Sequence, residues 1–317
     1  MVKIAIAGGS STVANEIIDA LVATQRHEIV IFSRKVHNTP LLFWAAELII
    51  DMIVQDIPTE KTALGITWKN TTYQDKDQLV EALDGVHTVL SFLVTQEDPA
   101  SIAQKNLIDA AIQAGVKRFA PSEWAWYISL LLVLEYTLFQ PGTFVNYLTH
   151  PYQSAKHVPS MELFFDFENR RAIFMDDGDN DRMSFITVQD FTKVIVQAVE
   201  FEGEWPVIGG IRGTDISIGN LIALGEKVRG GAKFQVERVK AQDLQNGTWS
   251  TSWVPRIDHP SIPREQIDAM SRIVCAGILL ATHDGAYSVS DEWNRLLPSF
   301  QPTPIEKFLA ESWHDKP

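Results

Sequence analysis

Residues 2–14 read Val-Lys-Ile-Ala-Ile-Ala-Gly-Gly-Ser-Ser-Thr-Val-Ala. The apolar run that ends at Ala7 is typical of a strand buried on both faces of a sheet. The small residues after it predict a tight turn, and residues 13–21 then carry apolar side chains at the spacing of one helix face. Another apolar run follows at 28–32. A strand, a turn, a helix and a strand within about 30 residues predict a βαβ unit.

The alternation of strand and helix patterns continues through the first half of the chain. Ser101 and Gln104 have the spacing of a capping box, in which two side chains bind backbone N–H groups at the start of a helix. The expected elements are a helix at 77–83, a strand at 86–94, a helix at 101–115, and strands at 117–120 and 136–140. This repeated alternation predicts an α/β fold with a doubly wound parallel sheet.

The second half of the chain has a more mixed pattern. Thr187 can cap a helix at about 188–200, because its hydroxyl can accept an N–H group of the first turn. The other expected elements are helices at 216–229, 263–281 and 304–313 and a strand at 234–239. We therefore predict a first domain over residues 1–149 and a smaller, mixed α+β lobe over 150–317. Segments at about 183–215 are expected to return and pack on the first domain.

Charge and cysteine content exclude several classes of function. The chain has 317 residues, and 27 Lys and Arg against 40 Asp and Glu give a net charge of −13. Such a surface repels phosphate backbones and anionic lipids, so neither nucleic acid nor membrane is an expected partner. The single cysteine, Cys275, lies in an apolar run and is expected to be a buried, inert thiol. With no disulfide and no signal-peptide pattern at the first residues, we expect a cytoplasmic protein.

The first turn is the candidate dinucleotide site, because ligands of such sheets bind at the carboxyl ends of the strands. The glycine pattern that usually supplies the tight turn is represented here by Gly8, Ser11 and Ala14. Ser11 adds a Cβ where a pyrophosphate approaches, although its hydroxyl can donate to a phosphate. The helix start also offers free N–H groups. A small-residue turn that binds no ligand fits the same residues.

The end of the second strand distinguishes the two nicotinamide cofactors. An NAD site has an acidic residue there for the ribose hydroxyl, whereas an arginine accommodates the 2′-phosphate of NADP. The sequence has Arg34 and Lys35 and no acid. We infer NADP(H), with two solvated surface cations as the alternative.

Several stretches of this chain match a known family. The most specific is Gly-Val-Lys-Arg-Phe-Ala-Pro-Ser-Glu-Trp at 115–124; the others lie at 4–9, 85–92, 138–142, 166–172, 252–255 and 290–294. The chain resembles the NmrA-like and isoflavone-reductase-like proteins, an atypical branch of the short-chain dehydrogenases. Within this branch it is similar to fungal oxidoreductases found in secondary-metabolite gene clusters.

The resemblance implies a Rossmann-like NADP(H) domain and a small substrate lobe. The residues that it places around the cofactor are Gly8, Gly9, Ser10, Ser11, Thr12 and Val13 at the pyrophosphate, Arg34 and Lys35 at the 2′-phosphate, and Ser91, Phe92, Pro121, Ser122 and Gln140 along the cofactor channel. The implied function is an NADP-dependent reductase that acts on a small apolar metabolite, for example a polyketide. The alternative is an NADP(H)-binding regulatory protein without turnover.

Two departures from the family pattern affect catalysis. The reductases have a catalytic lysine in the region of 124–155, where this chain has none, and residues 36–66 form an unusually long apolar insertion. Both fit either divergence or an altered gene structure. The candidate proton donors that remain are Glu123 and the pair Tyr152 and Lys156, whose Tyr-x-x-x-Lys spacing is that of ordinary short-chain dehydrogenases. A bracing charge and a chance match are the alternatives for these candidates, and His150 is a further possible proton carrier.

Two further patterns have plain structural explanations. The acidic run 176–181 resembles a calcium loop, but its twelfth position is Thr187 rather than the required glutamate, so we expect an exposed turn between a strand and a helix and no metal site. Trp249, Trp253 and Trp293 can form aromatic walls for an apolar substrate, or they can pack in the core.

Overall fold

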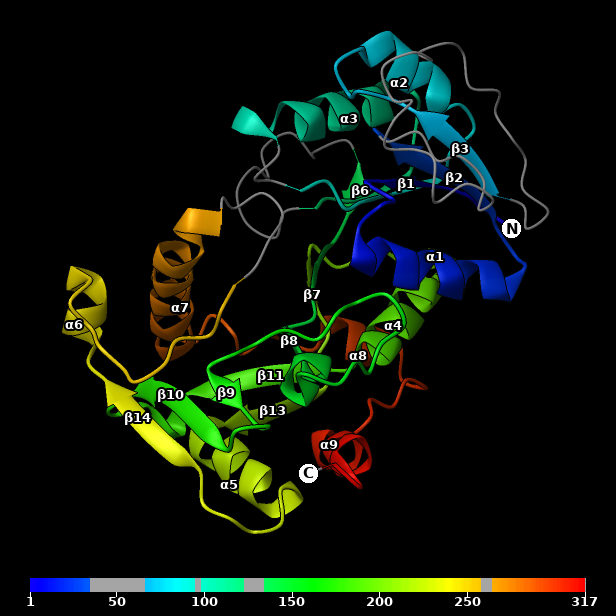
Figure 1. Ribbon diagram of the computed structural model, residues 1–317. Coiled ribbons are helices and arrows are strands. Elements are labelled where there is room, and N and C mark those ends of the chain that lie inside the picture. Colours follow the sequence, from blue (N-terminus) through cyan, green and yellow to red (C-terminus); the bar gives the residue numbers. More distant parts are fainter. Residues whose placement is uncertain (35–65, 95–97, 123–133, 258–263, 317) are drawn as a thin grey trace, which may run out of the picture. The chain divides into compact units, whose positions relative to one another are not determined.

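The computed structural model describes residues 1–34, 66–94, 98–122, 134–257 and 264–316 (Figure 1). It divides into two compact units. The first consists of Met1–Leu138 and Val199–Val207, and the second of Phe139–Ala198 and Ile208–Pro317. The first segment of the first unit ends at Leu138, before the boundary predicted at residue 149. A shorter segment than the predicted 183–215 returns to the first unit.

The first unit contains a six-stranded sheet. Its strands are β1 (Lys3–Ala7), β2 (Glu28–Ser33), β3 (Ile66–Asn70), β4 (Thr88–Ser91), β5 (Arg118–Ala120) and β6 (Glu135–Tyr136), in the spatial order β3-β2-β1-β4-β5-β6. All neighbouring pairs are parallel; Ile6, for example, lies opposite Ile31 on one side and Leu90 on the other. The predicted doubly wound parallel sheet is thus confirmed. The strand β3 was not predicted, because it directly follows the insertion at 36–66.

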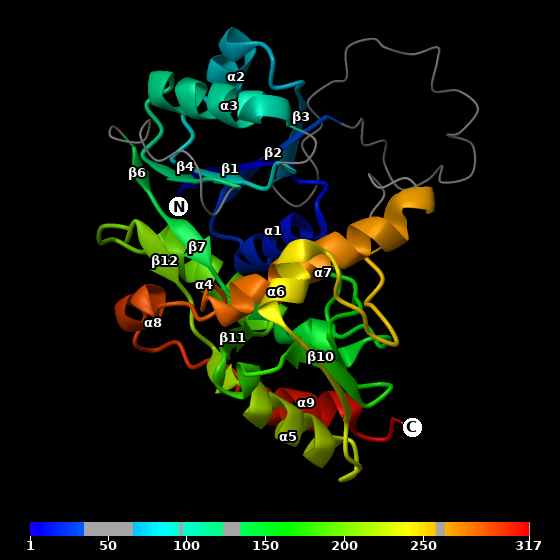
Figure 2. The same ribbon diagram turned by 90° about the vertical axis from the view of Figure 1, so that its left-hand side faces the viewer.

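Three helices cover the two faces of this sheet. The helix α1 (Thr12–Thr24) lies on one face, and α2 (Lys76–Ala82) and α3 (Ile102–Gln113) lie together on the other (Figures 1 and 2). Ala5 and Phe32 of the sheet belong to the same buried cluster as Leu79 of α2 and Leu107 of α3. Side chains on both faces of the strands are therefore buried, which explains their continuous apolar runs.

The start of α3 differs from the predicted capping box. Ser101 is the residue before the helix, but its side chain makes no capping hydrogen bond. The carboxylate of Asp98 instead accepts the backbone N–H groups of Ala103 and Gln104, at 2.8 and 3.0 Å. The Gln104 side chain is turned toward the sheet, where its Oε1 accepts the Ser91 hydroxyl at 2.8 Å. The carboxylate of Asp98 therefore caps the helix in place of the Ser101 hydroxyl.

The second unit is built from short strands and six helices among its described residues. One sheet has the order β13-β11-β8, a second has the order β14-β10-β9, and β7 pairs with β12. The strands are β7 (Leu138–Gln140), β8 (Thr143–Phe144), β9 (Phe165–Asp166), β10 (Arg171–Met175), β11 (Arg182–Ile186), β12 (Ile208–Gly210), β13 (Thr214–Ser217) and β14 (Gln235–Val239). The helices are α4 (Val188–Glu200), α5 (Ile218–Val228), α6 (Ala241–Asn246), α7 (Ile267–His283), α8 (Glu292–Leu296) and α9 (Ile305–Trp313). The strand β7 and the helix α4 each extend across the boundary between the units.

Aromatic side chains form much of the core of the second unit. Trp293 is fully buried and stacks on Phe139, with ring centroids 5.6 Å apart. Trp249 is also buried, and Trp253 packs at the edge of the same core. Of the two explanations for these tryptophans, core packing is confirmed for Trp249 and Trp293. Cys275 is buried as predicted, and burial raises the pKa of its thiol to about 11.

Two predictions about local structure in the second unit have different outcomes. The Thr187 hydroxyl accepts the N–H of Asp190 at 2.9 Å, so the predicted cap of α4 is confirmed. The acidic run 176–181 connects β10 to β11, not a strand to a helix as predicted. Two of its carboxylates have basic side chains beside them: Arg238 binds Asp179 at 2.8 Å, and His283 lies 3.0 Å from Asp181.

The described residues include neither a cluster of metal ligands nor a helix that could span a membrane. No group of three His, Cys, Asp or Glu side chains in these residues is arranged to hold a metal ion. Of the helices that the structure describes, none combines the length and the apolar character needed to cross a bilayer.

Candidate functional site

The candidate site of the first unit lies where the strand order reverses. The strands β2 and β4 flank β1 on opposite sides: from β1 the chain order runs through β2 and β3 toward one edge of the sheet and resumes at β4 toward the other. A crevice outside the carboxyl ends of the strands at such a switch point is the usual ligand site of this architecture. At this switch point lie the turn after Ala7 and the residues after Ser91, which are joined by the 2.8 Å hydrogen bond from the Phe92 N–H to the Ala7 carbonyl.

The turn requires glycine at both of its first positions. Gly8 has a φ of +70°, and a Cβ on it would lie 2.5 Å from the Phe92 carbonyl oxygen. A Cβ on Gly9 would lie 2.2 Å from the Cγ2 atom of Ile31. The first glycine therefore provides the backbone conformation and the close approach to β4, and the second allows close packing on β2.

The start of α1 leaves backbone donors at this turn. Ser11 caps the helix, since its hydroxyl oxygen accepts the Ala14 N–H at 3.1 Å. A hydroxyl that accepts still has its own hydrogen to donate, so the predicted phosphate contact of Ser11 is compatible with this cap. Among the described residues, the N–H groups of Thr12 and Val13 have no acceptor. Free N–H groups and the positive end of the helix dipole together favour an anion.

Arg34 lies near the same turn. It is exposed at the end of β2, as predicted, and Lys35 lies outside the described residues. The link to the turn is Tyr73, whose hydroxyl lies 3.0 Å from the Gly8 nitrogen. Burial raises the pKa of Tyr73 to about 12, whereas the hydrogen bond from Gly8 and the positive charge of Arg34 act in the opposite direction. Arg34 follows two residues after Phe32, whose carbonyl lies 3.2 Å from the Gly8 nitrogen.

Tyr73 is a residue of this site that the sequence did not reveal. It follows β3, is only 1% exposed and has a φ of +61°. Its hydroxyl also donates to the Phe32 carbonyl at 3.1 Å. The available signal was a lone aromatic residue just after a strand, and it was missed because β3 itself was not predicted.

The other predicted channel residues have structural partners in the first unit. The Ser91 hydroxyl is buried and donates to Gln104, so it is not directed at a ligand. The Ser122 hydroxyl donates to the Leu93 carbonyl at 2.5 Å and thereby joins the segments that follow β5 and β4. Phe92 and Pro121 are partly exposed beside them, and Glu123 lies outside the described residues.

The remaining candidates belong to the second unit. The main-chain carbonyl of Gln140 accepts the Ile211 N–H at 3.0 Å. Tyr152 and Lys156 lie in a segment without helical structure, so they do not share a helix face as the dyad of ordinary short-chain dehydrogenases does. The Tyr152 ring instead packs edge-on against Trp313 and under the Lys316 ammonium group.

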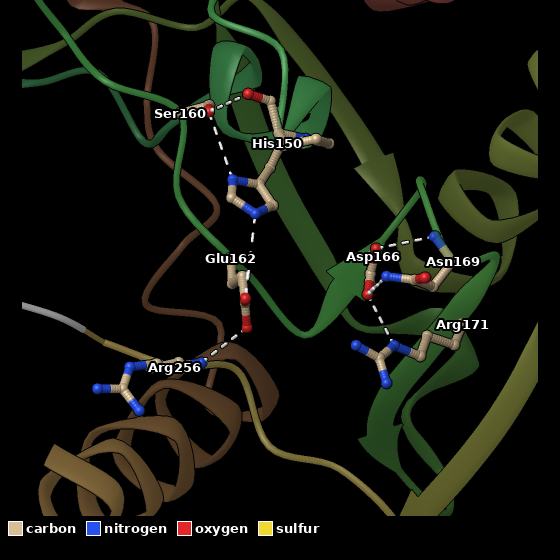
Figure 3. Close-up of polar contacts among 8 residues, drawn as sticks. His150, Ser160, Glu162, Asp166, Asn169, Arg171 and Arg256 are labelled. Atoms are coloured by element: carbon tan, nitrogen blue, oxygen red, sulfur yellow. Dashed lines mark hydrogen bonds and ion pairs between the residues drawn. The ribbon is translucent and has the colours of Figure 1, made fainter. Parts of the chain in front are cut away.

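A small cavity of about 10 Å³ lies within the second unit. Its lining consists of Tyr147, Leu148, His150, Glu162, Leu163, Phe165, Asp166 and Phe167. Figure 3 shows His150 between Ser160 and Glu162: its Nδ1 atom lies 3.3 Å from the Ser160 Oγ atom and its Nε2 atom 4.0 Å from Glu162. Pockets for drug-sized ligands usually enclose about 300–1,000 Å³. The cavity by itself is therefore too small for a dinucleotide.

Asp166, at the edge of this cavity, has a structural role. Its carboxylate accepts the Asn169 N–H at 3.0 Å, the Asn169 side-chain amide at 2.8 Å and the Arg171 Nε–H at 2.7 Å (Figure 3). The Arg171 guanidinium in turn stacks 4.0 Å from the ring centroid of Trp253. The motif at 166–172 thus closes the β9–β10 hairpin.

Comparison with known proteins agrees with the sequence motifs and the sheet order. Residues 2–128 match the NmrA-like family. The chain is 30% identical over 201 residues to the oxidoreductase BOA1 of Botryotinia fuckeliana, a match that spans 56% of this chain and 60% of that protein. It is 23% identical over 361 aligned positions to the oxidoreductase swnN of Metarhizium robertsii, covering 99% and 98% of the two chains.

A solved structure has the same fold. The NADPH-dependent quinone oxidoreductase QOR2 of Escherichia coli, complexed with NADPH, superimposes with a TM-score of 0.62 at 17% identity, covering 97% of this chain and 99% of QOR2. At this identity the likeness establishes the fold. Together with the family match, it confirms the resemblance inferred from the motifs. Over residues 2–128, this chain is similar to the NmrA-like family, and the rest of its length lies outside that match.

Proposed function

We propose that this protein is an NADP(H)-dependent oxidoreductase, a reductase of a small apolar metabolite. The observation that carries the proposal is the turn at the switch point of the sheet, where Gly8, the free N–H groups of Thr12 and Val13, and the Arg34 charge lie near one another. These groups are complementary to a pyrophosphate and a 2′-phosphate.

The residues present fit a nicotinamide dinucleotide. Gly8 and Gly9 keep side chains out of the turn, and the start of α1 offers N–H donors and the Ser11 hydroxyl. Arg34, with Lys35 beside it in the sequence, would hold the 2′-phosphate. The nicotinamide, when bound, supplies the hydride, and the protein orients it and excludes water.

The names of the relatives support a redox function. Both fungal relatives are named oxidoreductases, and QOR2 is an NADPH-dependent quinone oxidoreductase. A role in fungal secondary metabolism, with a polyketide or a similar apolar carbonyl compound as substrate, is part of the proposal. The proposed location is the cytoplasm.

A second candidate is an NADP(H)-binding regulatory protein without turnover. It is favoured by the absence of lysine between 124 and 155 and by the non-helical segment that carries Tyr152 and Lys156. Both observations remove a usual proton donor from the reductase mechanism.

Two measurements on the purified full chain test these proposals. Calorimetric titration with NADPH and separately with NADH should show binding with NADPH preferred; binding of neither would refute both candidates. Loss of NADPH absorbance with quinones or enones as substrates would then support the reductase. Tight binding without any turnover across such a panel would favour the regulatory protein.

A further inference from the structure

Resting on the proposed dinucleotide site, we infer that Tyr73 is a positioning residue of that site. Its hydroxyl holds the β1–α1 turn against the end of β2, and this fixes the backbone donors that would receive the pyrophosphate. The inference adds to the site a residue from the segment after β3, which belongs neither to the glycine turn nor to α1.

The hydroxyl of Tyr73 joins two backbone segments that are distant in sequence. It accepts the Gly8 N–H at 3.0 Å and donates to the Phe32 carbonyl at 3.1 Å. The same carbonyl lies 3.2 and 3.3 Å from the nitrogens of Gly8 and Gly9. One side chain therefore uses both its donor and an acceptor function to connect the turn after β1 with the last residues of β2.

The ring that carries this hydroxyl is itself fixed. Tyr73 packs in the core cluster beneath α2 and α3. Its carbonyl accepts the Asn106 side-chain amide at 2.8 Å, and its N–H binds the Thr71 hydroxyl at 3.1 Å. A tyrosine with a positive φ is uncommon and persists only where its surroundings determine it. The backbone conformation at this position therefore serves to direct the side chain.

The position of Gly8 determines where the N–H donors at the start of α1 lie. The Gly8 carbonyl accepts the Ser11 N–H at 3.0 Å, and Ser11 caps the helix through Ala14. A shift of Gly8 would therefore move Ser11 and the adjacent N–H groups of Thr12 and Val13. The Tyr73 hydroxyl binds the Gly8 N–H, so Tyr73 acts through the turn and not by contact with the ligand.

The chemistry of the hydroxyl suits this role at any physiological pH. Donating to Phe32 while accepting from Gly8 requires the neutral form of the phenol. Burial raises the pKa of Tyr73 to about 12, so the neutral form is present throughout the neutral range.

The test is the Tyr73→Phe variant, with Tyr136→Phe as the matched control. Tyr136 packs against the same core cluster, so both changes remove one hydroxyl from one ring of this unit. Dissociation constants for NADPH and NADH are measured by calorimetry well below the melting temperature of each variant. Tyr73→Phe removes both hydrogen bonds of the hydroxyl, but the Gly8 N–H keeps its contact with the Phe32 carbonyl, so we expect both cofactors to bind only about 3- to 10-fold more weakly. The preference for NADPH should be unchanged, because the pyrophosphate is common to both cofactors.

The outcomes separate this inference from the proposed function. If the wild-type protein binds neither cofactor, the proposed function and this inference both fail. If the wild type binds and Tyr73→Phe binds equally well, even with a lowered melting temperature, Tyr73 is only structural. A loss confined to NADPH would also overturn the inference, because it would place the effect at Arg34. Faster hydrogen exchange in residues 8–14 of Tyr73→Phe, absent from Tyr136→Phe, is the expected structural signature.

Discussion

The carboxylate of Asp98 accepts the backbone N–H of Gln104 at 3.0 Å, although Ser101 is the residue that immediately precedes the helix α3. The same carboxylate binds the Ala103 N–H at 2.8 Å. Asp98→Ala should therefore lower the free energy of unfolding by about 1–2 kcal/mol, as loss of a helix cap does. Urea unfolding followed by circular dichroism measures this change.

Ser101→Ala is the matched control for this cap. Its side chain makes no capping hydrogen bond, so we expect a change within about 0.5 kcal/mol. A larger loss for Ser101→Ala than for Asp98→Ala would show that the serine caps the helix in solution.

Gly8→Ala should abolish cofactor binding and destabilise the first unit. The residue has a φ of +70°, and the new Cβ would lie 2.5 Å from the Phe92 carbonyl. Gly85 has nearly the same φ, +69°, but no atom lies within 4 Å of its Cβ position. Gly85→Ala should therefore lose only about 1–2 kcal/mol from the left-handed backbone, whereas Gly8→Ala should lose roughly 1–3 kcal/mol more from the clash.

Thermal unfolding and NADPH titration of both glycine variants provide the comparison. Cofactor binding retained by Gly85→Ala and lost by Gly8→Ala would assign the turn to the site. Equal stability of the two variants would contradict the close approach of Gly8 to β4.

Arg34→Ala should change cofactor preference. Charge-assisted hydrogen bonds to a phosphate contribute about 1.5–3 kcal/mol, so NADPH affinity should fall about 10- to 100-fold while NADH affinity stays nearly constant. Calorimetric titration with each cofactor measures both values.

Arg26→Ala is the control for general charge effects. Arg26 is also an exposed arginine of the first unit, but its guanidinium lies 3.0 Å from Glu200. We expect it to leave both affinities unchanged. Equal weakening of NADPH and NADH in Arg34→Ala would remove Arg34 from the 2′-phosphate site.

The last turn of α7 should give the protein a pH-dependent stability. Hydrogen bonding to Asp181, at 3.0 Å, together with the charges of Asp177 and Asp284, raises the pKa of His283 above its usual 6.5. The stabilisation is therefore complete below the pKa of the unfolded state. It is lost as the pH rises through the higher folded-state value. Because the side chain is 33% exposed, the effect should stay below about 1 kcal/mol.

The measurement is urea unfolding of the wild type and of His283→Asn between about pH 5 and pH 9. The wild type should be the more stable at acidic pH, and the difference should shrink toward alkaline pH and in high salt. A difference that grows with rising pH would contradict the ion pair with Asp181.

The sequence predicted those parts of the fold in which local pattern and packing agree. The apolar run of β1, the helix face of α1 and the Thr187 cap of α4 all depend on residues close together in the chain, and the structure has each of them. The parallel pairing of the strands in the first sheet followed from the repeated alternation of strands and helices.

The features that were missed depend on contacts that the local sequence rules do not include. No local rule relates Tyr73 to Gly8, 65 positions away, and the capping rule favoured Ser101 because it does not consider the reach of Asp98. The candidate catalytic residue Glu123 and the candidate 2′-phosphate residue Lys35 lie outside the described residues, so the roles predicted for them stay predictions.

Residues 199–207 return to the first unit, so some contacts of this unit can form only late in the synthesis of the chain. Arg118, which is nearly buried, binds Glu135 at 3.0 Å and donates to the carbonyls of Phe201 and Gly203 at 2.5 and 2.7 Å. Emerging from the ribosome, residues 1–138 lack these last two acceptors until about 60 further residues have been synthesised. The whole first segment of the second unit, residues 139–198, must therefore be translated before Arg118 can donate to these two carbonyls. A messenger truncated after codon 138 would release a domain that never receives its final partners.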